Sequence, residues 1–367
     1  MIELEEAQEF VFGKCSKLSA EEVEISKSRG LVLAETVISN DDIPPFPNTA
    51  MDGYAVRASD TESAPVELKV IGTLPAGKVP DFEVGSGEAV RIMTGAVIPQ
   101  GADSVVMVEK TREVETSDSV IVEEGVKNGN FIRQPGEDFV KGTELFDPGT
   151  LIGAAHIGVF ATIGLEKVTV FKRPIVGVMS TGDELVQGAS DLKPGQIRDS
   201  NRHSIKALLD EMGVEVIDLG LIPDDEKDIE SALFSGVEKC DAIVTSGGVS
   251  MGDFDYVKVV LDRLGEMKWM QVAIKPAKPL AFGLLNGVPI FGLPGNPVSA
   301  MVSFELFMRP ALLKIMGYEQ IWRPYLKAKA TTSLKRRKDG KVHFARVTLA
   351  RNNDSYEVSF LEGQGSH

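Results

Sequence analysis

Three glycine-rich loops are the segments of this sequence whose residue types could do chemistry. They are Ser180-Thr-Gly-Asp-Glu184, Thr245-Ser-Gly-Gly-Val-Ser250 and Gly292-Leu-Pro-Gly-Asn-Pro297. Glycine lets a backbone approach a ligand closely, and the free N–H groups at a helix start bind anions. One such loop is typical of any tight turn between a strand and a helix. Three of them in one part of the chain predict a phosphate-binding site.

Acidic residues accompany the same loops. Glu184, Asp224, Asp225, Asp253 and Asp255 are expected at the edge of the sheet where the loops lie. Carboxylates repel a phosphate unless a hard cation such as Mg²⁺ lies between them, so the pattern predicts a divalent-metal site. Asp225 and Asp253 fit the role of helix caps equally well.

Lys275 and Lys278 lie in the proline-interleaved segment Ala273-Ile-Lys-Pro-Ala-Lys-Pro279. Proline stiffens the backbone, and a positive charge held on a stiff segment can bind an oxyanion. We interpret both lysines as part of the anion site. The sequence has neither a Walker A pattern nor GxGxxG, which gives no support to a P-loop NTPase or a dinucleotide dehydrogenase. His203 is expected to cap or pack a helix rather than to catalyse.

The elements that must position these residues alternate between strand and helix. The expected strands are Ile175–Met179, Glu215–Leu219, Ala242–Thr245 and Val288–Phe291. The expected helices are Ser200–Met212, Asp225–Glu238, Asp255–Leu264 and Pro297–Ile315. This alternation predicts a doubly wound parallel sheet, in which ligands bind beyond the carboxyl ends of the strands.

The remainder of the chain predicts three further domains around this one. We expect residues 1–50 with 141–172 to form an elongated helical and linker domain, 51–140 a small β domain, 173–318 the α/β domain, and 319–367 a basic C-terminal β domain. The helix expected at Leu151–Ile163 is apolar enough to be buried or to lie at an interface. The expected fold class is therefore multidomain α/β.

Composition excludes several classes of protein. Of 367 residues, 43% are apolar and 25% charged, which is typical of a globular chain, and the net charge of −15 opposes binding to nucleic acid or anionic lipid. No apolar stretch reaches the ~20 residues of a membrane span, and the first residues are acidic, unlike a secretory signal. Cys15 and Cys240 show no disulfide framework or metal-ligand spacing, so we expect both to be reduced and buried. We expect a cytoplasmic protein with no nucleic-acid or membrane partner.

Seven motifs, in order along nearly the whole chain, resemble those of one family. They are Pro45-Phe-Pro-Asn-Thr-Ala-Met-Asp-Gly-Tyr-Ala55, Arg91-Ile-Met-Thr-Gly-Ala96, Arg133-Gln-Pro-Gly-Glu-Asp138, Ser180-Thr-Gly-Asp-Glu-Leu185, Thr245-Ser-Gly-Gly-Val-Ser250, Ile274-Lys-Pro-Ala-Lys-Pro279 and Gly292-Leu-Pro-Gly-Asn-Pro-Val-Ser-Ala300. Together they resemble the molybdopterin molybdenumtransferases, the family of MoeA and the gephyrin E domain. The resemblance implies insertion of molybdate into adenylylated molybdopterin, with a divalent cation such as Mg²⁺, to give molybdenum cofactor and AMP. It also implies a four-domain homodimer whose cleft is shared between subunits, with other enzymes of cofactor synthesis as candidate partners.

The resemblance carries roles over residue by residue. The implied catalytic residues are Asp52, Thr94, Asp138, Glu184, Lys275 and Lys278. The substrate-binding residues, including those of the glycine-rich loops, are Arg133, Ser246, Gly247, Gly248, Ser250, Pro294, Gly295, Asn296, Pro297, Arg346 and Ser366. The implied metal ligands are Glu184, Asp224 and Asp255. The resemblance places an oxyanion site for molybdate at Arg346 and Ser366.

This sequence departs from the family pattern at two places. Gln271 stands where some members carry lysine, and the family continues for several strands after His367, so the last domain is expected to be incomplete. Two alternatives stay open: a dimeric scaffold like gephyrin, and the preceding molybdopterin adenylyltransferase. The retained carboxylates and lysines argue against a scaffold, and the flanking β domains favour the later step. Molybdate and tungstate, and the physiological divalent metal, are not distinguished.

Overall fold

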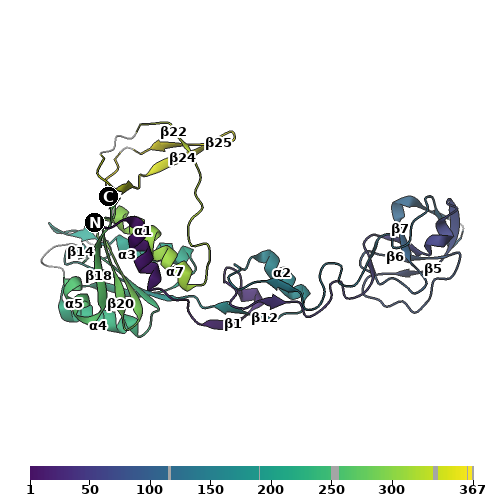
Figure 1. The fold of residues 1–367 in the computed structure, drawn as a ribbon, viewed down its shortest axis with the longest axis horizontal. Helices are drawn as coiled ribbons and strands as arrows, with labels where there is room; N and C mark the ends of the chain where they lie inside the picture. The colour runs from purple at the N-terminus through teal and green to yellow at the C-terminus, as the bar shows by residue number, and fades with distance from the viewer. Residues whose placement is uncertain (115–116, 190, 249–255, 334–337, 362, 366–367) are drawn as a thin grey trace. The chain divides into compact units, whose positions relative to one another are not determined.

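The computed structural model describes residues 1–114, 117–189, 191–248, 256–333, 338–361 and 363–365. The chain divides into two compact units (Figure 1). The first unit comprises Met1–Glu35, Pro148–Ala154 and Lys167–His367, and the second comprises Thr36–Asp147 and Ala155–Glu166. The fold is multidomain α/β, as the sequence predicts. The four expected domain ranges stay a prediction.

A six-stranded sheet forms the centre of the first unit (Figure 1). Its strand order is β16 (Glu215–Ile222), β13 (Ile175–Thr181), β17 (Ala242–Ser246), β21 (Val288–Leu293), β20 (Pro279–Leu285) and β18 (Glu266–Gln271). The strands from β16 to β21 pair in parallel, which confirms the four predicted strands. Every residue of β17 is buried, as expected for a parallel strand covered on both faces.

The other two strands, which the sequence did not predict, add an antiparallel part to the four predicted parallel strands. β20 pairs antiparallel with both β21 and β18. The β20–β21 connection is the turn Asn286–Gly287, where φ is 51° and 84°. Positive φ at both turn residues matches the twist of a hairpin, and Asn-Gly is the pair that adopts it most readily. This turn adds an antiparallel hairpin strand, β20, which the sequence analysis did not predict.

Helices cover the two faces of this sheet. On one face α1 (Leu4–Gly13), α3 (Asn201–Glu211), α6 (Pro297–Ser303) and α7 (Arg309–Ile315) share a core with Val178 and Val244. Figure 1 shows α1 beside α7. On the other face α4 (Glu226–Val237) and α5 (Tyr256–Leu264) share a core with Met179 and Ile243. The alternation of side chains along each strand thus divides the core into two layers.

The helix expected at Pro297–Ile315 is interrupted. Between α6 and α7 lies a π-helical turn, η4 (Phe304–Met308). Pro310 has no N–H to donate to the carbonyl of Leu306, which would be its partner in a regular helix. The side chain of Gln8 donates to that carbonyl instead, at 3.1 Å. The expected helix at Ser200–Met212 is confirmed as α3, and that at Asp225–Glu238 as α4.

Smaller pairings complete the first unit. β1 (Ala20–Glu24) pairs antiparallel with β12 (Lys167–Phe171), and β19 (Ile274–Lys275) pairs in parallel with β23 (Val342–His343). The others are η1 (Ile25–Lys27), the pair β14 (Leu185–Val186) with β15 (Ile197–Arg198), and the sheet of β22 (Lys329–Ala330), β25 (Ser355–Phe360) and β24 (Val347–Asn352).

The second unit is built on another six-stranded sheet. Its order is β7 (Ser104–Met107), β4 (Gly53–Val56), β6 (Glu88–Ile92), β5 (Val66–Leu74), β9 (Ser119–Val122) and β8 (Thr111–Val114). The other elements are β2 (Val37–Ile38) with β11 (Glu144–Phe146), β3 (Asn48–Thr49) with β10 (Ile132–Arg133), η2 (Ala58–Thr61), η3 (Val108–Lys110) and α2 (Ala154–Thr162). Two buried clusters, around Tyr54 and around Ala55, form its core.

Among the described residues, no helix has both the length and the hydrophobicity needed to cross a membrane. Cys15 and Cys240 are free and buried, as predicted. Burial raises the pKa of Cys15 to about 12, so its thiol is not a nucleophile at neutral pH.

Candidate functional site

The glycine-rich loops leave the carboxyl ends of β13, β17 and β21, three neighbouring parallel strands. Gly247 and Gly248 have φ of 94° and 67°, a region that L side chains rarely adopt. A Cβ at Gly247 would also lie 2.6 Å from the carbonyl oxygen of Thr181. The second loop therefore packs directly on the end of β13, and only glycine fits there.

Asp199 and Asn201, at the start of α3, tie all three loops together. Asn201 is buried, and its Nδ2 donates to Ser246 Oγ and to the carbonyl of Gly295, both at 2.7 Å. Asp199 Oδ1 accepts from the hydroxyl of Ser180 at 3.1 Å. The start of one helix thus fixes the ends of β13 and β17 and the turn after β21. Sequence reasoning missed Asp199 and Asn201, although Asp-Ser-Asn before a helical segment is a recognisable start signal.

A buried ion pair anchors the same segment. Arg202 donates to Asp199 through Nε at 2.8 Å and to Asp218 on β16 through Nη1 at 2.6 and 2.7 Å. Lys206 adds a contact to Asp218 at 2.7 Å. Burial opposes ionisation of Asp218, yet the hydrogen bonds from Lys206 and Arg202 lower its pKa to about 2. Asp218 therefore stays charged near neutral pH where it binds Arg202 and Lys206 of α3.

Two of the predicted metal ligands lie together at this edge with a third carboxylate that was not predicted. The backbone N–H of Asp183 donates to Asp224 at 3.3 Å, and that of Asp224 donates to Asp183 at 3.2 Å. Burial raises the pKa of Asp224, and the negative charges of Asp183 and Glu184 raise it further. A cation here would relieve that repulsion.

The fit of this cluster to a metal ion follows from its donors. Among the residues that the structure describes, no three His, Cys, Asp or Glu side chains form a ready metal site. Mg²⁺ commonly uses one or two carboxylates and completes its shell with substrate phosphates, so Glu184 and Asp224 fit it. Asp255, the third predicted ligand, and Asp253 lie outside the described residues. Asp225 is a helix cap, since its side chain accepts from the N–H groups of Lys227 and Asp228.

Lys275 and Lys278 are exposed on a well-anchored backbone. The carbonyl of Lys275 accepts from Phe344 N, and that of Lys278 from Val272 N, both at 2.8 Å. Within the described part of the chain, neither ammonium group has a carboxylate partner. Both side chains are therefore available to bind an anion.

The third glycine-rich loop ends in Pro297, which is the first residue of α6. Proline suits this position because its missing N–H would have no partner inside the helix. Asn296 is the N-cap residue, and its side chain makes no capping bond. Pro294 and Gly295 precede it, so all four predicted residues lie at the helix start.

Arg346 is engaged with the chain terminus. Its Nη2 donates to the carbonyls of Gly363 and Gly365 at 2.7 and 2.6 Å, and its backbone exchanges two hydrogen bonds with the side chain of Gln364. Arg346 therefore holds residues 363–365 in a loop around its own side chain. Ser366, and likewise Ser250 of the second glycine-rich loop, lie outside the described residues.

The second unit brings together the other four predicted residues in two pairs. Thr94 donates its backbone N–H and its hydroxyl to Asp52 Oδ1 at 2.7 and 2.6 Å, and these bonds lower the pKa of Asp52. Arg133 Nη2 lies 2.6 Å from Asp138 Oδ1. Both pairs flank β3, because Arg133 is opposite Asn48 and the loop of Thr94 bonds to Thr49.

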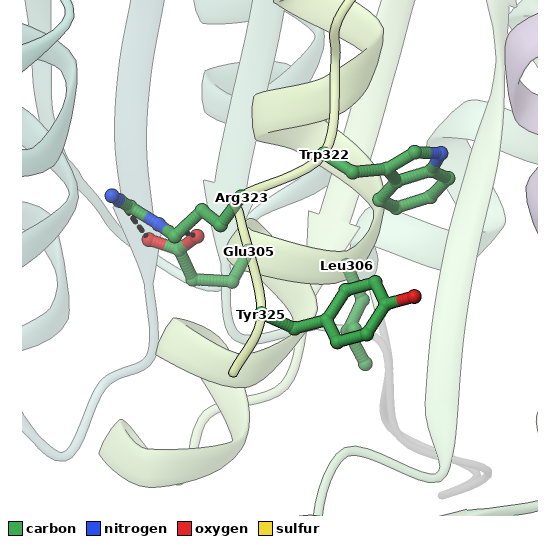
Figure 2. A pocket seen from close by; sticks show the side chains of 5 residues that line it. All are labelled: Glu305, Leu306, Trp322, Arg323 and Tyr325. Atoms are coloured by element: carbon green, nitrogen blue, oxygen red, sulfur yellow. Dashed lines mark hydrogen bonds and ion pairs between the residues drawn. The ribbon is translucent and has the colours of Figure 1, made fainter. Parts of the chain in front are cut away.

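A separate apolar groove of about 700 Å³ lies beside η4 (Figure 2). It is lined by Glu305, Leu306, Trp322, Arg323 and Tyr325. Figure 2 shows Arg323 turned toward Glu305, to which it donates two bonds of 2.7 Å. None of the predicted site residues lines this groove.

Comparison with known proteins agrees with the arrangement of motifs. Residues 2–164 match the family model of the MoeA N-terminal region (domain I and II), and residues 177–314 that of a probable molybdopterin binding domain. A molybdopterin molybdenumtransferase of Haemophilus influenzae is 41% identical over 95% of this chain and 86% of its own length. One of Nostoc is 38% identical over 84% of this chain and 72% of its own.

Solved structures show the same relationship. The crystal structure of a molybdopterin biosynthesis MoeA protein from Pyrococcus horikoshii has a TM-score of 0.83 and 30% identity, covering 100% of this chain and 91% of that one. These findings confirm the resemblance inferred from the seven motifs. The chain belongs to the molybdopterin molybdenumtransferase family.

Proposed function

We propose that this chain inserts molybdate into adenylylated molybdopterin, releasing AMP and molybdenum cofactor. The observation that carries the proposal is the edge of the sheet in the first unit. There Asn201 and Asp199 hold the ends of three strands in one rigid frame, beside the carboxylates of Glu184 and Asp224. Loops that expose backbone N–H groups, next to a candidate cation site, suit a nucleotide with several phosphates.

The residues around this frame have separate roles. Glu184 and Asp224, with Asp255, would hold a divalent cation that neutralises phosphate charge. Lys275 and Lys278 present positive charge to the oxygen that becomes more negative when the phosphoanhydride breaks. The substrate-binding role extends to Ser246, Gly247, Gly248 and Gly295. Fixed donors of this kind stabilise a transition state without reorganising during the reaction.

The residues of the second unit supply a second set of charges. Asp52, kept ionised by Thr94, and Arg133, paired with Asp138, are the groups that would contact the substrate there. For Arg346 we propose molybdate binding, together with Ser366. Molybdate carries two negative charges, and a basic segment attracts it. We assign the reaction to the cytoplasm, where buried free thiols such as Cys15 and Cys240 persist.

The direct test is release of AMP from adenylylated molybdopterin in the presence of molybdate and Mg²⁺. We expect release that requires both additions and is lost in Lys275→Ala. Glu215→Gln, at the opposite end of β16 from Asp224, is the control and should leave the rate unchanged. Lack of metal-dependent release by the intact chain would contradict the proposal. Synthesis of the adenylylated compound from ATP would identify the preceding adenylyltransferase step instead.

We further propose that the chain acts as a homodimer with clefts shared between subunits. The support is α2, an apolar helix in which only Phe160 is buried. Mixing the two variants Asp52→Ala and Asp255→Ala tests this sharing. If each cleft uses both subunits, a heterodimer has one intact cleft, and mixing restores up to about half of the activity per heterodimer. No recovery, with heterodimers verified by mass, would mean that each cleft is built within one chain.

A further inference from the structure

Phe131 adopts a backbone conformation that disfavours it. Its φ is +54°, and it occupies the third position of the turn Gly129–Ile132, closed by the bond from Ile132 N to the carbonyl of Gly129 at 3.2 Å. This position favours glycine or asparagine, because a Cβ crowds the backbone at positive φ. A bulky aromatic residue here is a genuine outlier.

The surroundings force the turn into this shape. Two hydrogen bonds of 2.9 Å join Asn130 to Val105. The backbone N–H of Val105 donates to the carbonyl of Asn130, and Nδ2 of Asn130 donates to the carbonyl of Val105. Gly129 N donates to Asp103 at 2.8 Å. The turn is therefore set by β7 and the residues before it, and Phe131 must accept the strained conformation that results. Such strain concentrates at functional positions.

The side chain of Phe131 is only partly covered by the fold. It is 37% exposed and belongs to neither of the two buried clusters described for the second unit. An asparagine would satisfy the turn with less strain. The exposed part of the ring therefore points to a contact that the second unit does not itself provide.

The position of the ring identifies that contact. The carbonyl of Phe131 accepts from Ala50 N at 2.9 Å, and the next residue of that strand end is Met51, which is 38% exposed. Asp52 follows directly, and Arg133 lies two residues beyond Phe131 on the other strand. Phe131 and Met51, both exposed, thus lie within two residues of Arg133 and next to Asp52 respectively, and these are one residue from each charged pair of the candidate site. Ligands that combine a flat ring with phosphate groups bind to exposed aromatic side chains by stacking of the ring, while nearby charged side chains orient the polar groups of the ligand.

We infer that Phe131 is the stacking platform for a flat heteroaromatic ring of the pterin nucleotide, a substrate-binding residue of the proposed reaction. The inference rests on the proposed function, because that function supplies the ligand. The substrate contains two such rings, the pterin and the adenine, and stacking alone accepts either. Binding energy recovered from the ring then compensates for the strained turn.

Three variants separate the ring from the strain. Phe131→Asn removes both, Phe131→Leu removes the ring and keeps an apolar branched residue in the strained turn, and Phe131→Tyr keeps both. Val79→Asn is the control for loss of an exposed apolar residue in the same unit, since Val79 is 84% exposed. The probes are pterin, followed by its fluorescence anisotropy, and AMP, followed by equilibrium dialysis.

We expect Phe131→Asn and Phe131→Leu to weaken pterin binding and raise KM about fivefold or more, the loss of one stacking contact, with kcat within about twofold. Phe131→Tyr and Val79→Asn should bind as the parent chain does. Phe131→Asn should also raise the melting temperature by roughly 1–3 °C, because relief of strain favours the folded state. A turn with only a structural role would show the thermal gain without any loss of affinity.

The alternatives give different results. Loss of AMP affinity with pterin affinity intact would support stacking and identify adenine as the ring. Unchanged affinity for both probes in Phe131→Leu, in a chain that releases AMP normally, would overturn the inference and leave the proposed function standing. A shift in sedimentation of Phe131→Leu without a change in affinity would mean that a second copy of the chain covers the ring, which also overturns it. If the parent chain releases no AMP, the proposed function is wrong. The anisotropy of bound pterin still tests the role of Phe131 in that case.

Discussion

Asn201 lies within 2.7 Å of the carbonyl oxygen of Gly295, across the 94 positions that separate the two residues. The same Nδ2 donates to Ser246 Oγ, so one amide group holds two of the glycine-rich loops. A carbonyl fixed in this way cannot turn toward a bound phosphate. The N–H groups of the loop can then face an anion without reorganising, which is the property that a phosphate site requires.

Replacing Asn201 by alanine should loosen both loops. The change leaves Ser246 Oγ and the Gly295 carbonyl without this donor, and we expect a loss of about 1–3 kcal/mol in the free energy of unfolding. We also expect KM for the pterin nucleotide to rise by roughly tenfold, since misplaced groups bind less well. His203→Ala, exposed on the same helix, serves as the control for both urea denaturation and kinetics. Equal KM values in the two variants would rule out a role of Asn201 in positioning the loops.

Asp224 should link stability to pH and to Mg²⁺. Its pKa is raised in the folded state, so its protonation favours folding, and this contribution is lost as pH rises through the raised pKa. Without metal at neutral pH, Asp224→Asn should therefore be at least as stable as the parent chain. Mg²⁺ should raise the melting temperature of the parent chain but not that of Asp224→Asn. The control is Glu215→Gln, and an equal response to Mg²⁺ in all three proteins would place the cation elsewhere.

Thr94 should control the ionisation of Asp52. Its hydroxyl and its N–H lower the pKa of Asp52, so the carboxylate stays charged as pH falls below the ordinary value. Thr94→Val removes the side-chain bond and keeps the backbone bond, so the pKa should rise toward the ordinary value of about 3.9. A carboxyl NMR titration measures the shift, with Thr73→Val as the control. An unchanged titration of Asp52 would show that the hydroxyl bond is not formed in solution.

Arg202 should be the most sensitive charged residue of the first unit. Its side chain is 2% exposed and that of Asp199 is 1% exposed, so Arg202→Met leaves a buried carboxylate without its partner. Such a loss costs about 3–5 kcal/mol. The exposed pair of Arg263 with Glu230 provides the comparison, and Arg263→Met should cost less than about 1 kcal/mol. Urea denaturation of both variants gives the two values, and a similar small cost in each would contradict the buried pair.

The strands were the part of the fold that the sequence predicted best. β13 and β17 are near-continuous apolar runs, because a parallel strand is covered on both faces. The hairpin at Asn286–Gly287 carries a clear local turn signal, but the antiparallel pairing of β20 with β18 depends on tertiary contacts. Pro310 is a local signal for the break in the helix. The Gln8 side chain that satisfies the Leu306 carbonyl comes from α1, and no local pattern contains that contact.

The residues of the candidate site likewise fall into those that local sequence predicts and those that depend on tertiary contacts. Glycine and proline motifs point to the loops, since they describe local backbone requirements. Asp199 and Asn201 act through contacts with residues on other strands, so their importance depends on tertiary structure. Whether Asp225 caps a helix or binds a metal could be decided only by the bonds that its side chain makes. Single residues were thus predictable where their role is local.

The insertion of the second unit into the sequence of the first has a consequence for biosynthesis. β1 pairs with β12, and residues 25–166 separate the two strands. A ribosome that adds about 5–20 residues per second needs roughly ten seconds to make that interval. During this time β1 has an unpaired edge, while the sheet of the second unit can already close. The order of emergence from the ribosome therefore favours folding of the inserted unit first. Until β12 is made, the unpaired edge of β1 could pair with another chain. A chaperone, or the charges of Glu21, Glu22 and Glu24 on β1, would prevent this.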